Sequence, residues 1–112
     1  MFVRRDLTDT VPTPSGNMHF VKKGSGYPVV FLHPLGTSIW TWESVIDSLA
    51  QSYTCYAFDM LGHGDSDNPT GHFNLPDYAQ ALDHACQVLN IHRANIVGNS
   101  VGAILATETA AS

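Results

Sequence analysis

The chain has 112 residues, of which 44% are hydrophobic and 13% charged, and its formal net charge at pH 7 is −5. This composition is typical of a small folded domain and argues against disorder. Four of the five basic residues precede Gly24, so no basic stripe is available for nucleic acid or for an anionic membrane surface. No apolar run approaches the ~18 residues of a membrane span, and the start lacks the apolar core of a signal peptide.

The cysteines and histidines carry no metal-binding pattern. Cys55 and Cys86 lie in apolar stretches and resemble neither a metal site nor a disulfide framework. We therefore expect two buried thiols in a reducing compartment, and a cytoplasmic protein with no metal and no cofactor. Most of four further histidines are expected to be exposed to solvent: His19, His72, His84 and His92.

Four segments have the hydrophobic pattern of β-strands. Residues 18–23, MHFVKK, alternate apolar and polar side chains, which predicts a strand with one face in water. Three continuous apolar runs predict strands buried on both faces. They are PVVFLH (28–33), YTCYAFD (53–59) and ANIVG (94–98).

Helical patterns separate and follow these strands. Apolar residues recur at helical spacing over residues 39–51, and a second helix is expected after Asn74, which can form a capping box with Asp77. A third helix is expected from Val101 onward. Alternating strands and helices with short links predict an α/β fold, with a mostly parallel sheet and helices on both faces. The apolar stripe of the second helix comprises Tyr78, Leu82, Ala85, Cys86 and Leu89.

The motif Gly98-Asn99-Ser100-Val101-Gly102 lies at the junction between the last strand and the third helix. Ligands of parallel α/β sheets bind at the carboxyl ends of the strands, so Ser100 stands where chemistry is expected. A sharp turn at this point would expose the hydroxyl group, and Gly98 and Gly102 would let strand and helix approach closely. The helix N-terminus adds unpaired N–H groups suited to a developing oxyanion.

Residues 16–112 resemble the α/β-hydrolase family. The resemblance rests on three motifs in family order: FLHPLGTSIWTW, FDMLGHGDSDNP and the nucleophile elbow VGNSVGA. It implies that Ser100 is the nucleophile and that the backbone N–H groups of Leu35 and Val101 form the oxyanion hole. Pro34 replaces the usual glycine of the first motif. Proline has no N–H and a fixed φ, so it alters the chain just before the Leu35 donor.

The resemblance also gives structural roles to residues around the nucleophile. His33 is expected to brace the oxyanion loop rather than act as general base, and His63 and Asp59 are expected to shape the second loop. Trp42 is expected to pack in the core, and Trp40 either packs there or lines a pocket. In this family the acid and the catalytic histidine follow the serine, and no histidine follows Ser100 in these residues.

We therefore expect residues 1–112 to be the N-terminal part of a single hydrolase domain whose acid, histidine and lid lie further along. The third helix has no stop signal, and the strand at 94–98 would be a bare apolar edge. The 112 residues alone are expected to be inactive.

The leading functional hypothesis is a serine hydrolase that cleaves an ester-type small molecule through an acyl-enzyme. Two related hydrolase activities remain as alternatives. PLGTS resembles the oxyanion loop of enol-lactonases, and VGNSVGA resembles the elbow of C–C bond hydrolases of aromatic catabolism. A non-catalytic binding protein of the same fold is the alternative from another class. Ser100 excludes the aspartate nucleophile of dehalogenases. The sequence carries no signal for an oligomeric state.

Overall fold

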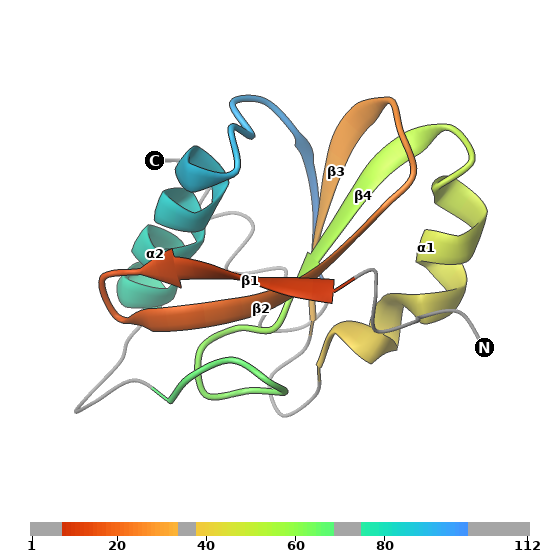
Figure 1. Cartoon of the computed structure of the whole chain (residues 1–112). Helices are drawn as coiled ribbons and strands as arrows, with labels where there is room; N and C mark the ends of the chain where they lie inside the picture. Colours follow the sequence, from red (N-terminus) through yellow and green to blue (C-terminus); the bar gives the residue numbers. More distant parts are fainter. Residues whose placement is uncertain (1–7, 34–37, 69–74, 99–112) are drawn as a thin grey trace.

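The computed structural model describes residues 8–33, 38–68 and 75–98 of the chain. These residues form one five-stranded sheet with a helix on each face (Figure 1). The strands are β1 (Thr8–Thr13), β2 (Gly16–Lys23), β3 (Tyr27–Leu32), β4 (Tyr53–Phe58) and β5 (Asn95–Gly98). The helices are α1 (Glu43–Leu49), preceded by a 3₁₀ turn η2 (Ile39–Trp42), and α2 (Leu75–Val88).

The sheet has the order β1-β2-β4-β3-β5. The strands β4, β3 and β5 run parallel, whereas β1 and β2 form an antiparallel hairpin that pairs with β4. In the sheet, β4 lies on one side of β3 and β5 on the other, so the connection from β3 to β4 and the connection from β4 to β5 run in opposite directions. Right-handed crossovers in opposite directions place α1 and α2 on opposite faces. The predicted α/β class, with a mostly parallel sheet and helices on both faces, is confirmed.

Two hydrophobic cores fill the space between the sheet and its helices. Alternate residues of one strand enter different cores: Val30 and Leu32 pack toward α2, whereas Val29 and Phe31 pack toward α1. In β4, Tyr56 and Phe58 face α2. Both faces of these strands are covered, which explains why their sequences are continuous apolar runs.

Most predicted elements are confirmed, with small shifts at their ends. The helix expected over 39–51 begins as the 3₁₀ turn η2 and ends at Leu49. In α2 the expected stripe faces the sheet, with Leu82 and Ala85 buried and Cys86 packed beside them. The proposed cap Asn74 and the third helix from Val101 lie outside the described residues.

One strand was missed, and two expectations about strands need correction. The strand β1 was not predicted, and it forms the outer half of a hairpin with β2. The expectation that β2 has one face in water is wrong over Met18–Val21, because four consecutive residues are buried. The expectation that β5 is buried on both faces is also wrong. Asn95 and Val97 are exposed, and within the described residues neither belongs to the core beside α1.

Candidate active site at the carboxyl ends of the parallel strands

Three parallel strands end side by side at one edge of the sheet. Leu32, the last residue of β3, is in register with Phe58 at the end of β4 and with Gly98 at the end of β5. The next residues after β3 and β4 are His33 and Asp59, both buried. Ser100, Leu35, Val101 and Gly102 lie outside the described residues. Their roles stay predictions, and the described part of the site consists of the side chains at this edge.

His33 is fully buried at the end of β3. Its Nε2 atom accepts a hydrogen bond from the backbone N–H of Met60, at 3.0 Å. An imidazole nitrogen that accepts a hydrogen bond carries no proton, so this contact fixes the neutral ring with its proton on Nδ1. Because a general base needs a free lone pair, the Met60 contact disfavours His33 as base and supports the expected structural role.

His63 lies beside His33, with the ring centroids 5.1 Å apart. Its Nδ1 atom is 3.2 Å from the carbonyl oxygen of Leu61. Since a carbonyl can only accept, Nδ1 is the donor in this contact. His63 lies between Gly62 and Gly64, whose φ angles are +83° and +52°. These left-handed conformations favour glycine and turn the chain sharply around His63.

Asp59 is 1% exposed and organises the loop that follows β4. Its Oδ2 atom accepts hydrogen bonds from Asp65 N–H at 3.0 Å and from His19 Nδ1 at 2.8 Å. Its backbone carbonyl accepts a hydrogen bond from Ser66 Oγ at 2.6 Å. These contacts join the start of the loop to residues 65 and 66 and to β2, which fits the loop-shaping role expected for Asp59.

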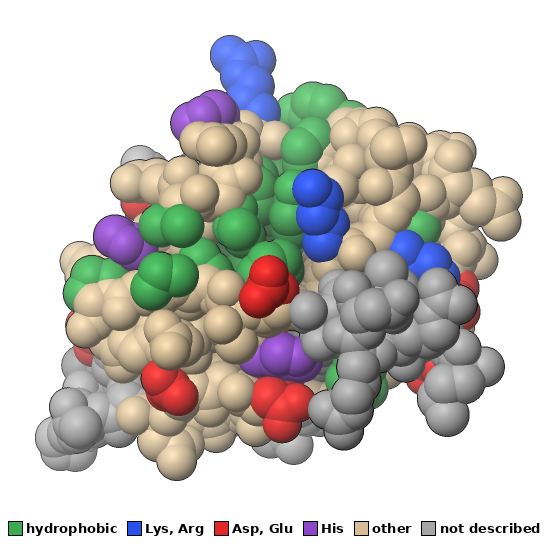
Figure 2. Space-filling view, in the orientation of Figure 1, with side chains coloured by type: hydrophobic (Ala, Val, Ile, Leu, Met, Phe, Trp, Pro, Cys, Tyr) green, Lys and Arg blue, Asp and Glu red, His purple; other side chains and the backbone are tan. Residues whose placement is uncertain are grey.

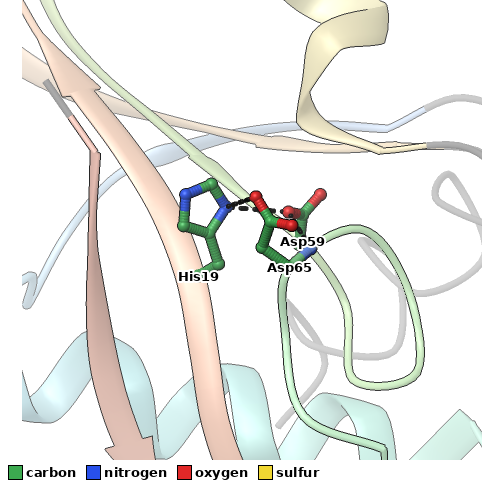
Figure 3. Close-up of side chains that lie close together, drawn as sticks. All are labelled: His19, Asp59 and Asp65. Carbon is green, nitrogen blue, oxygen red and sulfur yellow. Dashed lines mark hydrogen bonds and ion pairs between the residues drawn. The ribbon is translucent and has the colours of Figure 1, made fainter. Parts of the chain in front are cut away.

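His19 is the residue at this edge that sequence reasoning placed wrongly. We expected most of the scattered histidines to be exposed; His92 is exposed, His84 is half-buried and His72 lies outside the described residues. His19 is 8% exposed and faces Asp59 (Figure 3). The contact joins residues 40 positions apart. The local pattern of β2 gives no signal for it, because it depends on β2 pairing with β4.

The side chains of His19, Asp59 and Asp65 bring three possible metal-ligand atoms within 4.8 Å of one another. Sequence spacing missed this group because its members lie on β2 and on the loop after β4. The Asp59 oxygen nearest His19 already accepts two hydrogen bonds, and Asp65 is exposed. The arrangement therefore works as a hydrogen-bonded pair that holds a loop.

The two tryptophans lie in η2, which precedes α1. Trp42 packs against Phe31 with ring centroids 5.2 Å apart, as expected for a core residue. For Trp40, packing in the core and lining a pocket were both left open; it is 43% exposed and meets the His19 ring edge-on at 6.5 Å, so it is not a buried core residue.

The two thiols lie on opposite faces of the sheet. Cys55 is buried in the core beside α1, and Cys86 packs against the core beside α2. Both are free, as expected, but Cys86 is half-buried rather than buried as expected. Burial raises the pKa of the Cys55 thiol, and burial together with the nearby Asp83 carboxylate raises the pKa of Cys86 to about 11.

Two surface grooves in the described part of the chain lie away from this edge. One groove, of about 410 Å³, lies between α2 and the amino ends of β3 and β5. It is lined by apolar side chains such as Val30, Leu82 and Ile96, and hydrophobic side chains gather over these elements in Figure 2. The other groove separates the β1–β2 turn from α2. Ligands of parallel sheets bind at the opposite, carboxyl ends, so neither groove is the candidate active site.

The parallel strands and the helices on both faces define an α/β domain, with buried polar side chains at its carboxyl edge. Residues 27–112 match the family model described as alpha/beta hydrolase fold. The chain belongs to the alpha/beta hydrolase fold family.

Known proteins similar to this chain have diverse names. An uncharacterized protein of Mycobacterium tuberculosis is 39% identical over 87 residues, which are 78% of this chain and 26% of that protein. A soluble epoxide hydrolase of Corynebacterium sp. is 35% identical over 89 residues, 80% of this chain and 31% of that protein. The crystal structure of a loop variant of haloalkane dehalogenase DbeA from Bradyrhizobium elkanii has a TM-score of 0.88 at 28% identity, covering 93% of this chain and 35% of that one.

The chain thus spans about a quarter to a third of the length of these relatives. Across residues 8–33, 38–68 and 75–98, no helix is long and apolar enough to cross a membrane.

Proposed function

We propose that the full-length protein is a serine hydrolase of this family that cleaves a small ester-type substrate in the cytoplasm. The observation that carries the proposal is the register at the carboxyl edge. Gly98, the first residue of the elbow motif, lies beside Leu32, directly before the buried His33. Ser100 follows Gly98 by two residues in the sequence, so we expect it near the carboxyl ends of the strands, where parallel sheets bind ligands.

In this proposal, residues 1–112 are the N-terminal part of a single domain. They supply Ser100 as nucleophile and the backbone N–H groups of Leu35 and Val101 as oxyanion donors, with Gly98 and Gly102 allowing the tight turn. His33 holds the chain at the end of β3. The acid and the catalytic histidine come from the chain after residue 112, and the chemistry needs no metal or cofactor.

The proposed reaction has two steps. Ser100 Oγ attacks the ester carbonyl carbon while its proton passes to the histidine, and the negative charge develops on the carbonyl oxygen. The C–O bond to the alcohol then breaks, and the alcohol leaves with that proton. Water hydrolyses the resulting acyl-enzyme, which releases the carboxylic acid and restores the serine.

The similar epoxide hydrolase and dehalogenase support a hydrolase in general, since both names describe hydrolytic enzymes. Serine at position 100 argues against the aspartate nucleophile of dehalogenases for this chain. Within serine chemistry, the PLGTS segment and the elbow VGNSVGA favour enol-lactones and C–C bonds next to a carbonyl as the second candidate substrates.

The test compares the full-length protein with its Ser100→Ala variant on p-nitrophenyl acetate, an enol-lactone and a vinylogous diketone. We expect a burst of p-nitrophenol followed by steady turnover, and a loss of about 10⁶ in kcat in the variant. A protein that binds these compounds without cleaving them would be the non-catalytic alternative. Unchanged turnover in the variant would refute the proposed nucleophile.

A further inference from the structure

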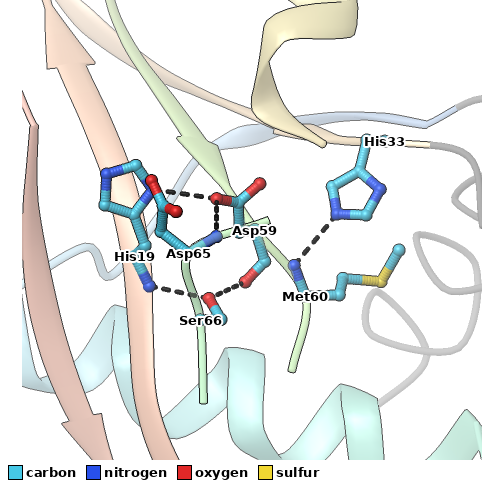
Figure 4. A network of polar contacts seen from close by, with 6 residues as sticks. All are labelled: His19, His33, Asp59, Met60, Asp65 and Ser66. Carbon is cyan, nitrogen blue, oxygen red and sulfur yellow. Dashed lines mark hydrogen bonds and ion pairs between the residues drawn. The ribbon is translucent and has the colours of Figure 1, made fainter. Parts of the chain in front are cut away.

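His19 is joined to the loop after β4 by three hydrogen bonds, and Figure 4 shows the two that reach the Asp59 carboxyl group and the Ser66 hydroxyl group. Its Nδ1 atom donates to Asp59 Oδ2 at 2.8 Å, and its backbone N–H donates to Ser66 Oγ, also at 2.8 Å. Its backbone carbonyl accepts from the Asp59 N–H at 2.8 Å. The two side chains are buried, so this pair holds the beginning of the loop firmly against β2.

The same pair is connected to His33 through Met60. Met60 follows Asp59 directly, and its N–H is the donor to His33 Nε2. A displacement of Asp59 would therefore move the Met60 amide and weaken the contact that orients the His33 ring. The hydrogen bonds run from β2 through the start of the loop to the end of β3, and we call His19, Asp59, Met60 and His33 the relay.

A second contact links His19 to the chain beyond the end of β3. The ring of Trp40, in η2, lies edge-on to His19, with 6.5 Å between centroids and 65° between planes. Edge-to-face ring pairs at this separation are favourable. His33 directly precedes residues 34–37, and Trp40 follows them closely. His19 is therefore connected to His33 through Asp59 and Met60, and to Trp40 through the ring contact.

We propose that His19 is a positioning residue for the reaction. Through Asp59 and Met60 it orients His33, and with Trp40 it fixes the carboxyl end of β3, which precedes the proposed oxyanion donor Leu35. This inference rests on the proposed function. It predicts an effect on kcat rather than on KM, since oxyanion contacts strengthen as charge develops in the transition state.

The experiment uses the full-length protein with three histidine variants. His19→Asn keeps an N–H donor near the position of Nδ1, and His19→Leu removes it. His92→Leu is the matched control, because His92 is exposed and has no place in the relay. We expect His19→Leu to lower kcat on p-nitrophenyl acetate about tenfold, less than the ~10²–10³-fold loss of a whole oxyanion donor. We expect KM to stay within about twofold, His19→Asn to regain most of the loss, and His92→Leu to match the parent.

A second readout does not depend on catalysis. The ¹⁵N resonances of the His33 ring and the amide resonance of Met60 report the hydrogen bond between them. They should shift in His19→Leu and stay close to the parent in His19→Asn. If His19→Leu does not fold, Ser66→Ala loosens the same loop by removing the acceptor of the His19 N–H, and it should shift the Met60 amide and lower kcat about threefold.

The outcomes separate this inference from the proposed function. Full turnover in Ser100→Ala would refute the serine mechanism, whatever His19 does. Unchanged kcat and unchanged His33 resonances in His19→Leu would refute the relay and leave the mechanism standing. Equal losses in His19→Asn and His19→Leu would also overturn it, because the donor atom would then not be the cause. A change in KM alone would overturn it as well, because the expected effect is on kcat.

Discussion

Gly64 tests whether the Asp59 carboxyl group holds the loop after β4. Gly64 has a φ of +52°, and a Cβ atom there would overlap all three atoms of the Asp59 carboxyl group. Gly64→Ala therefore has two costs. A left-handed conformation costs a non-glycine residue about 1–2 kcal/mol. Displacing the carboxylate breaks its contact with His19, and a hydrogen bond to a charged group contributes about 1.5–3 kcal/mol.

We expect Gly64→Ala to lower the free energy of unfolding by about 2.5–5 kcal/mol, a large part of the 5–15 kcal/mol of a typical domain. The assay is urea unfolding of the full-length protein, followed by tryptophan fluorescence. A double-mutant cycle separates the two costs. In an Asp59→Ala background the overlap is gone, so Gly64→Ala should cost only the backbone share of about 1–2 kcal/mol. Equal costs in both backgrounds would refute the reasoning.

Two further predictions concern the oxyanion segment and the buried thiol. Pro34→Gly should change kcat on p-nitrophenyl acetate far less than the ~10²–10³-fold effect of a whole donor, because the expected donor is the N–H of Leu35; a gain of a hundredfold or more would show that proline disables the site. The pKa of Cys86 is about 11 in the folded protein against an ordinary value of 9.0, so in a Cys55→Ala background its reaction with a disulfide reagent at pH 8 should be about 100-fold slower folded than unfolded. Because this pKa is raised on folding, the stability that the thiol contributes is complete below pH 9 and is lost as the pH rises toward 11. Cys86→Ala should therefore weaken the fall in the free energy of unfolding between pH 9 and 11. The same pH dependence in parent and variant would contradict the assignment.

The parallel strands could be predicted because burial on both faces leaves a local signature. The runs PVVFLH and YTCYAFD contain almost no polar residue, since their alternate side chains enter two different cores. The strand β1 left no such signature. Its sequence TDTVPT has a single buried hydrophobic residue, Val11, and its extended form depends on pairing with β2. Strand propensity alone does not decide such a segment.

In the candidate site, too, some residues could be predicted from the local sequence and one could not. The order of the motifs pointed to the carboxyl edge, and His33 and Asp59 lie there because each directly follows a parallel strand. His19 could not be found from its neighbours in sequence. Its place depends on the antiparallel pairing of β2 with β4, which brings it to a loop 40 residues further along.

The central claim is that Ser100 is the nucleophile, and covalent labelling tests it most directly. The full-length protein is treated with a fluorophosphonate probe, which reacts with activated serines, and the modified peptide is mapped by mass spectrometry. The account predicts a single adduct on Ser100, which is lost in Ser100→Ala and after heat denaturation. An adduct on a different serine, or equal labelling of Ser100→Ala, would contradict it.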